Sequence, residues 1–218
     1  NLTVVPLFEE ATMPFSYLTL RSALEKGFVE ITEVSEGGSV PNLKVINHSE
    51  ELVLLIDGEE LRGAKQNRIV NTSILLAPKS ETLIPVSCTE RGRWHYTSRR
   101  FSDSSYMMSS KSRVSKNARL YAKLASMAHE PAGEFNSVHA YDAGQGEVWG
   151  DIRALHNKLR TSSRSEAMSD AFEQRENDIK DYVAAFPLQP GQTGMVALLE
   201  GKPVSADLIS QPDAYADL

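Results

Sequence analysis

Cysteine is nearly absent from this sequence, which has one, Cys88, among 218 residues. A single cysteine excludes an internal disulfide framework and a zinc site built from cysteines. The five histidines form no HxH or HxxxH pair, so the spacing typical of metal ligands is missing too. Walker, GxGxxG and GxSxG motifs, which would indicate phosphate, dinucleotide or serine-hydrolase chemistry, do not occur. We therefore expect no metal and no cofactor.

Long apolar segments are also missing. No run of about 18 apolar residues occurs, which argues against a transmembrane helix, and the opening "NLTVVPLFEE" lacks the basic start and apolar core of a signal peptide. These features predict a cytoplasmic protein that does not contact a membrane. With 41% hydrophobic residues the chain can bury one substantial core. We expect a single domain over residues 1–218.

Strand patterns dominate the first half of the chain. "FVEITEV" (28–34) alternates strictly between two faces, as a half-buried strand does. "RIVNTSILL" (68–76) and "ETLIPVSCTE" (81–90) are predicted as one strand each of the same sheet, and "GRWHYTS" (92–98) as a further strand. The short Ala77-Pro78-Lys79-Ser80 connection favours antiparallel pairing of the first two, because parallel strands need a long crossover.

The second half has helical spacing. Residues 102–115 hold seven serines and are predicted as a loop. Helices are expected over 111–128, over 147–160, and from a capping box at Ser163 and Glu166 along an apolar stripe to Phe186. Residues 191–210 indicate a hairpin that turns at Glu200-Gly201-Lys202.

Strands, then helices, then a hairpin argue against a doubly wound parallel sheet. The predicted fold is α+β, with a mainly antiparallel sheet built by the N-terminal half and the C-terminal hairpin. About three helices from the second half cover this sheet. The corresponding parts are a β-rich segment 1–101, a helical segment 105–186 and the terminal hairpin 191–210.

Positive charge is concentrated in the middle of an acidic chain. The formal net charge is −6, yet residues 61–123 hold thirteen Lys and Arg against three acidic residues, a local balance of +10. Such asymmetry indicates a local anionic ligand more than a nucleic-acid coat. Simple packing of this basic segment against the acidic flanks explains it equally well.

The stretch "KQNR" is the main candidate for a binding loop. It precedes an apolar strand, and its amides offer both donors and acceptors, whereas a solvated loop needs neither Gln nor Asn at these positions. The predicted ligand-binding residues are Lys65, Gln66, Asn67, Arg68, Asn71, Arg93, Trp94 and Gln145. Gln145 is included because it opens a helix, where backbone N–H groups attract anions.

Two carboxylates are candidates for general acid or base catalysis. Glu90 falls on the core side of the strand 81–90, where a carboxylate needs a cation or donors, and Glu60 precedes the "KQNR" loop. An internal ion pair of Glu90 is an equally weighted alternative. Neighbouring Glu59 and Arg62 fit an ordinary solvated loop. Cys88 falls on the apolar side of its strand and is expected to be a small hydrophobe rather than a nucleophile.

The segment "DGEELRGAKQNRIVNTSILLAPKSETLIPVSCTERGRWHYTSRRF", with the later "GQGEVW" and "LLEGKPVSADL", resembles the ARG and rhodanese-phosphatase-superfamily-associated protein domain, where ARG stands for ADP-ribosyl glycohydrolase. The resemblance covers nearly the whole chain and implies a cytoplasmic role near nucleotide or ADP-ribose metabolism. Where relatives more often have Asp-Gln before the helix, this chain has Gly144 and Gln145, so no acid is carried over. The matching positions are Glu60, Lys65, Gln66, Asn67, Arg68, Asn71, Cys88, Glu90, Arg93 and Trp94.

The leading hypothesis is a domain that binds a nucleotide-like or ADP-ribose-like anionic small molecule. If the domain is an enzyme, it hydrolyses this molecule or transfers a group from it. The alternative is a non-catalytic module whose basic segment docks an acidic protein or a nucleic acid, and of these two partners nucleic acid is disfavoured because aromatic residues are few there. A carbohydrate-active enzyme with two carboxylates is a third candidate. The sequence leaves open whether the protein forms a homo-oligomer. In each case residues 65–71 and 88–94 are predicted to lie side by side, with Glu60 at the same end.

Overall fold

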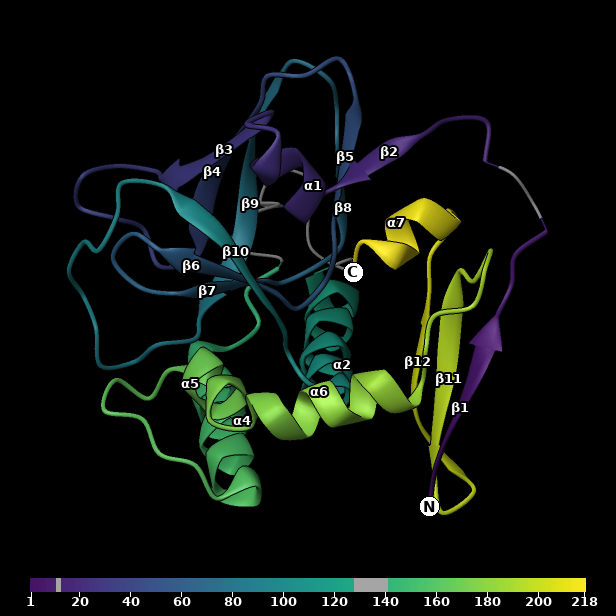
Figure 1. Ribbon diagram of the computed structural model, residues 1–218. Coiled ribbons are helices and arrows are strands. Elements are labelled where there is room, and N and C mark those ends of the chain that lie inside the picture. The colour runs from purple at the N-terminus through teal and green to yellow at the C-terminus, as the bar shows by residue number, and fades with distance from the viewer. Residues whose placement is uncertain (11–12, 128–140) are drawn as a thin grey trace.

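The computed structural model describes residues 1–10, 13–127 and 141–218. Their strands form three sheets, and the helices between residues 110 and 185 lie below the largest sheet in the view of Figure 1. The strands are β1 (Leu2–Leu7), β2 (Tyr17–Thr19), β3 (Val29–Glu33), β4 (Asn42–Asn47), β5 (Leu52–Leu55), β6 (Glu59–Gly63), β7 (Arg68–Val70), β8 (Ile74–Leu76), β9 (Ser80–Cys88), β10 (Phe101–Met107), β11 (Gly194–Leu199) and β12 (Lys202–Leu208).

The six-stranded sheet, in the order β10-β6-β7-β9-β4-β3, is antiparallel throughout and provides the main core. In β3 the residues Val29, Ile31 and Glu33 are buried and alternate with outward-facing ones, as the sequence predicts. The sheet curls, so its edge strands β10 and β3 contact each other, and Arg100 pairs with Glu30 at 3.0 Å. Both sheet edges are therefore covered.

Helix α1 (Leu20–Glu25) lies against both of these edges. It starts at Thr19, whose hydroxyl accepts from Ser22 N at 3.1 Å as an N-cap. Arg21 reaches across to Asp103 on β10, with its Nε 2.9 Å from Oδ2. This helix thus fills the opening that the curled sheet leaves.

The two smaller sheets have three strands each. One has the order β2-β5-β8, in which β2 and β5 are parallel, and the other has the order β1-β11-β12. The C-terminal hairpin β11–β12 pairs with β1, so segments from both ends of the sequence share one sheet (Figure 1). The predicted hairpin is confirmed, while its sheet is separate from the large one.

The helices confirm the predicted α+β class, and all of the described helices except α1 lie in the second half of the chain. α5 packs on α4, and α4 also contacts β9 of the large sheet. None of the helices in the described ranges is long and apolar enough to cross a membrane. The remaining helices are α2 (Ser110–Met127), α4 (Gln145–Leu159), α5 (Met168–Glu173), α6 (Glu176–Ala185) and α7 (Pro212–Ala216).

Three local predictions are wrong. Residues 92–98 form no strand, because Arg93 turns inward and the segment becomes a loop. Residues 101–107 form β10 although serines fill the segment, because β6 offers an unpaired edge. Segment 68–76 is two strands, β7 and β8, that belong to different sheets and separate at Asn71.

The predicted last helix is also divided. It consists of α5 and α6, with Gln174 and Arg175 between them, and its capping box does not form. Glu166 has a left-handed backbone, with φ at 52°, and Ser163 Oγ accepts from Ala167 N at 2.9 Å instead. Because residues 101–107 form β10, the β-rich segment extends to Met107 rather than to residue 101.

Candidate functional site

The ends of β7 and β9 bring the two predicted loops together. β7 pairs antiparallel with β9, with Arg68 opposite Cys88, and Thr89 N donates to Asn67 O at 3.0 Å. Glu60 lies on the neighbouring strand β6, opposite Ile69. The predicted proximity of segments 65–71 and 88–94, with Glu60 at the same end, is therefore confirmed.

Glu60 is completely buried at this end of the sheet. Thr89 Oγ1 donates to its Oε1 at 2.7 Å, while its Oε2 has no hydrogen-bond partner within the described ranges. Burial raises the pKa of the Glu60 carboxyl to about 7, and the hydroxyls of Thr89 and Ser104 only partly oppose this rise. A carboxyl that titrates near neutrality can both release and accept a proton at physiological pH.

Glu90 and Arg93 form a buried ion pair. Arg93 Nη2 lies 2.6 Å from Glu90 Oε2, and Arg93 Nε donates to the same oxygen at 2.7 Å. The guanidinium also donates to Ala64 O at 2.7 Å and to Asn67 Oδ1 at 2.9 Å. Arg93 thereby ties the "KQNR" loop to β9, and the geometry favours Glu60 over Glu90 as a proton-transfer group.

Arg68 is the least satisfied side chain of this cluster. It is fully buried, and its Nη1 donates to Gln66 Oε1 at 3.0 Å and to Gln66 O at 3.2 Å. Its Nε and Nη2 donate to no acceptor among the described residues, although Glu33 Oε1 lies 3.8 Å from Nη2. Buried donors without acceptors are costly, and Arg68 has the capacity to bond a further acceptor.

Lys65 and two aromatic rings form the solvent-facing side of the cluster. The Lys65 ammonium lies 5.4 Å from the Trp94 ring centroid and 5.1 Å from that of Tyr96, and donates to Gly37 O at 2.8 Å. Trp94 is 47% exposed, and its ring covers the Arg68 guanidinium at 5.6 Å. Two cations with an aromatic ring between them can hold an anion and a flat ring system.

Two other predicted ligand-binding residues bond the protein itself. Gln145, the first residue of α4, accepts from Cys88 N at 2.7 Å and donates to Cys88 O at 2.9 Å, so it mimics a neighbouring strand. Asn71 accepts from Ser87 Oγ at 2.9 Å and donates to Tyr141 O at 2.9 Å. These contacts supply a structural role for both amides and leave their ligand-binding role a prediction.

Cys88 is buried, and desolvation raises the pKa of its thiol to about 11. The thiolate needed for nucleophilic attack is therefore suppressed at neutral pH. In the described ranges no three His, Cys, Asp or Glu side chains converge as a metal site requires, so we assign no metal ligands.

The sequence patterns missed several buried charges near the site. Glu59 was expected in a solvated loop, but it is buried, accepts from Ile56 N at 2.6 Å, and has its pKa raised to about 8 by burial. Glu33 shares a strand face with Val29 and Ile31, and that position could have identified it as the Arg68 partner. Lys116 gives no such signal, because it belongs to an amphipathic helix with many cations.

Comparison with known proteins yields one family. The model of the ARG and Rhodanese-Phosphatase-superfamily-associated Protein domain matches residues 1–218. No curated protein and no solved structure matches the chain significantly.

Proposed function

Because the chain belongs to the ARG and Rhodanese-Phosphatase-superfamily-associated Protein domain family over its full length, we propose that it binds an anionic small molecule at the ends of β7 and β9. The proposed ligand is nucleotide-like or ADP-ribose-like. The observation that carries the proposal is the buried Arg68, which has two guanidinium nitrogens without acceptors beneath the half-exposed Trp94 ring. A phosphate oxygen is the acceptor that a guanidinium prefers.

The surface above Arg68 suits the rest of such a ligand. Lys65 lies between Trp94 and Tyr96, so a phosphate held by its ammonium would bring an attached base onto an aromatic face. Trp94 covers Arg68, so the ligand reaches the guanidinium when the ring turns outward. Its half-exposed state lowers the cost of that movement.

Glu60 is the group that we propose for proton transfer if the bound molecule is processed. Its carboxyl has a pKa of about 7 and one oxygen without a partner in the described part of the chain, so it can donate or accept a proton near neutral pH. Glu90 would then keep Arg93 and the loop in place. The corresponding reaction class is hydrolysis or transfer of a phosphate or ribose group.

The test is thermal melting and titration calorimetry with ADP-ribose, NAD, AMP and inorganic phosphate. We expect ADP-ribose or AMP to raise the melting temperature, and Trp94→Ala and Lys65→Ala each to reduce affinity at least about tenfold. Tyr182→Ala removes an aromatic side chain of similar exposure from α6 and is the matched control. Absence of any stabilisation at millimolar ligand would contradict the proposal.

The same titrations address the alternative interaction module. Binding of an acidic peptide or of DNA that weakens steeply with salt, without any effect of the small molecules, would favour docking through the basic segment. Sedimentation of the unliganded protein would establish whether a homo-oligomer forms.

A further inference from the structure

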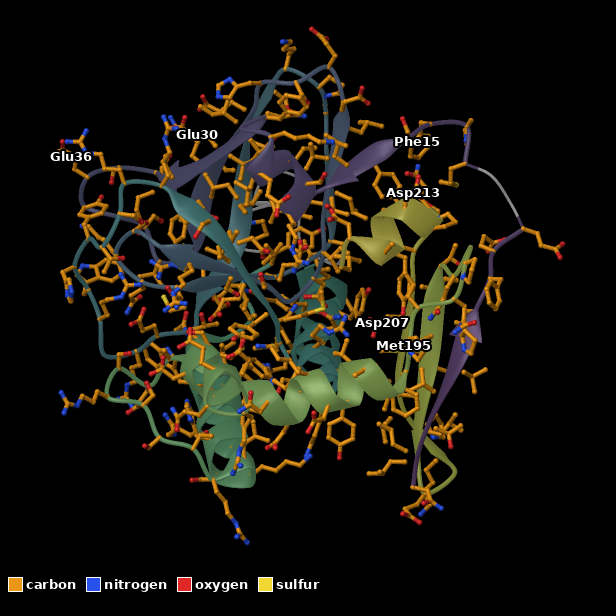
Figure 2. The ribbon with its side chains drawn as sticks, viewed as in Figure 1. Phe15, Glu30, Glu36, Met195, Asp207 and Asp213 are labelled. Carbon is orange, nitrogen blue, oxygen red and sulfur yellow. The ribbon has the colours of Figure 1, made fainter. Side chains whose placement is uncertain are left out.

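A large cavity lies away from the strand-end site, between the β2-β5-β8 sheet, α2 and the C-terminal hairpin. Its volume is about 1040 Å³. The cavity is open to solvent, and small-molecule pockets reach about 1,000 Å³. Its size is therefore that of a small-molecule site. Met195 and Asp207 line the cavity, and Figure 2 shows them on the far side of the molecule from Glu36. Glu36 marks the strand-end site, because its carbonyl accepts a hydrogen bond from Tyr96.

The walls of this cavity are mainly apolar and come from four parts of the fold. Leu54 and Leu75 are contributed by β5 and β8, Leu120 and Leu124 by α2, Leu208 by β12 and Tyr215 by α7. Such a lining, drawn from separate elements, matches the composition of small-molecule sites.

Helix α6 shows why an occupant is expected. It has no buried residue, and Val183, part of the apolar stripe seen in the sequence, is exposed and lines the cavity. Apolar area of this kind costs free energy in water, and a bound apolar molecule would cover it. Val183 thus brings an exposed apolar side chain of α6 to the cavity wall.

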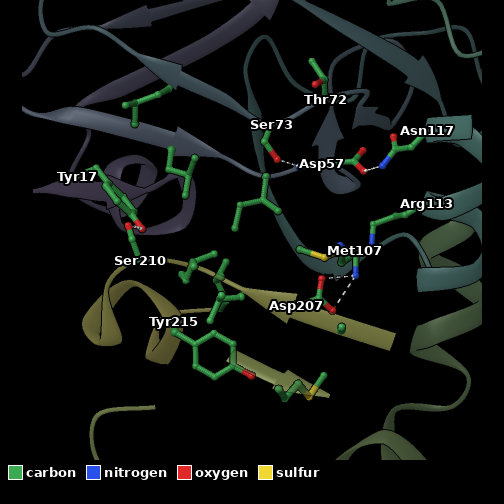
Figure 3. Close-up of a pocket in the computed structure, with 18 of the residues that line it drawn as sticks. Tyr17, Asp57, Thr72, Ser73, Met107, Arg113, Asn117, Asp207, Ser210 and Tyr215 are labelled. Atoms are coloured by element: carbon green, nitrogen blue, oxygen red, sulfur yellow. Dashed lines mark hydrogen bonds and ion pairs between the residues drawn. The ribbon is translucent and has the colours of Figure 1, made fainter. Parts of the chain in front are cut away.

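Charged side chains occur on one wall only, and each has an opposite partner. Arg113 Nη2 lies 2.8 Å from Asp207 Oδ1 (Figure 3), and Asp57 is bonded to Lys116, which does not itself line the cavity. Asn117 Nδ2 donates to the second oxygen of Asp57 at 2.7 Å. The wall therefore presents polar atoms without net charge, which disfavours an ionic head group because neither sign finds a free counter-charge.

We propose that this cavity binds a neutral amphipathic small molecule, with an apolar chain or ring system against the leucines and an uncharged hydrogen-bonding end at the wall formed by Asp57, Asn117, Arg113 and Asp207. Its hydroxyl or amide end would lie beside the hydroxyls of Thr72 and Ser73, which also line the cavity. This binding is independent of the anion site proposed above.

Titration with Nile red, a neutral dye that fluoresces in apolar surroundings, tests the proposal directly. We expect saturable binding of one dye per chain, displaced by decanol and not by decanoate or decyltrimethylammonium. Ala206→Trp, which fills the cavity from β12, should weaken dye binding at least about tenfold. Ala122→Trp places the same side chain on an exposed position of α2 outside the cavity and should leave binding unchanged.

Two further variants make the result decisive. Leu124→Trp fills the same cavity from α2 and covers the case in which Ala206→Trp fails to fold, judged by circular dichroism. Asp207→Asn leaves Arg113 without its counter-charge and should make decanoate the stronger competitor. Absence of saturable binding, equal displacement by all three competitors, or unchanged binding in a folded cavity-filling variant would each overturn the proposal.

Discussion

At the residue scale, the site is dominated by charged groups that the fold has removed from water. Arg68, Lys116 and Glu60 are all fully buried, which is unusual unless such groups are paired or serve a function. Lys116 is paired through Asp57, Asn71 O and Asn117 Oδ1, and burial still lowers its pKa. Arg68 and Glu60 keep atoms without hydrogen-bond partners in the described ranges, which is the basis on which we propose them as ligand-binding and proton-transfer groups.

Glu60 makes the stability of the protein depend on pH. Its folded-state pKa of about 7 lies above the ordinary value of 4.5, so folding favours the protonated form. Its contribution is neutral below about pH 4.5, becomes increasingly destabilising between about pH 4.5 and 7, and is constant at higher pH. Glu60→Gln should therefore match the wild type at about pH 4 and exceed it at about pH 8 by roughly 3 kcal/mol, measured by urea unfolding.

Glu173→Gln is the matched control for this comparison, because Glu173 lies in an exposed pair with Arg62. Its free energy of unfolding should differ little from that of the wild type at either pH. A difference between Glu60→Gln and the wild type that does not change with pH would contradict the assignment.

Gly63 is required by the backbone that carries the "KQNR" loop. Its φ is 125°, and a Cβ atom there would lie 2.9 Å from Arg100 O. Gly63→Ala should therefore destabilise the fold by about 2–4 kcal/mol. Gly201→Ala is the control, since its φ of 76° is also positive but no atom lies within 4 Å, and it should cost about 1 kcal/mol. Equal melting temperatures of the two variants would refute the steric account.

At the element scale, the strand-end cluster depends on the docking of α4 onto β9. Gln145 connects them by pairing with both backbone groups of Cys88, which otherwise lie in the interior. Gln145→Ala should cost about 2–5 kcal/mol, because a buried N–H and a buried C=O both lose their partner. The measurement is the free energy of unfolding in urea, with hydrogen exchange of the Cys88 amide as a local readout.

The chain contains a matched control for this prediction. Gln174 makes the same reciprocal pair with Ser162, accepting from its N at 3.2 Å and donating to its O at 2.7 Å, but at the surface. Water replaces those bonds in Gln174→Ala, so the cost should stay below about 1 kcal/mol. Similar losses for both variants would mean that burial is not the deciding factor.

The sequence predicted elements best where a local pattern determines them. Alternation located β3, and helical spacing located α2 and α4, because those signals come from the residues of the element itself. The division of residues 68–76 into β7 and β8 could not be predicted. Strand β7 ends just before Asn71, whose side chain bonds Ser87 and Tyr141, and both of these residues are distant from it in the sequence. β10 likewise exists because of its partner β6.

The candidate site was predictable to a similar extent. The meeting of Arg68, Cys88 and Glu90 was predicted from antiparallel pairing of neighbouring strands, and the structure confirms that β7 pairs with β9, although β8, which pairs with β5, lies in the connection between them. The turn of Arg93 into the interior and the burial of Glu59 depend on tertiary packing, and no spacing rule announces them. The large cavity also escaped prediction, since its walls come from segments far apart in the chain.

At the scale of the whole molecule, packing is uneven. Leu43, Ile31 and Val45 are fully buried in the large sheet, whereas every residue of β12 is exposed or half-buried. The hairpin is held to α2 chiefly through polar contacts, Arg113 with Asp207 and Ser110 with Ser205. We therefore expect β12 to open before the large sheet does.

Native-state hydrogen exchange measures this difference. Amides of β12 should lose protection at lower urea concentration than those of β9, by about 2 kcal/mol or more in opening free energy. Nile red or decanol should slow the exchange of β12 if the cavity binds them, because a ligand stabilises the closed form. Identical opening free energies in both strands would instead indicate one cooperative unit.

The contact between the edge strands β10 and β3 has a consequence for association. An open antiparallel sheet presents a row of free N–H and C=O groups that can recruit another chain and start aggregation. Here the Arg100–Glu30 pair and α1 cover both edges of the large sheet, so its most hydrophobic strands cannot add an intermolecular strand. Resistance to fibril formation should therefore depend on these side-chain contacts, and Glu30→Lys, which places like charges at the seam, should shorten the lag time of thioflavin-monitored aggregation.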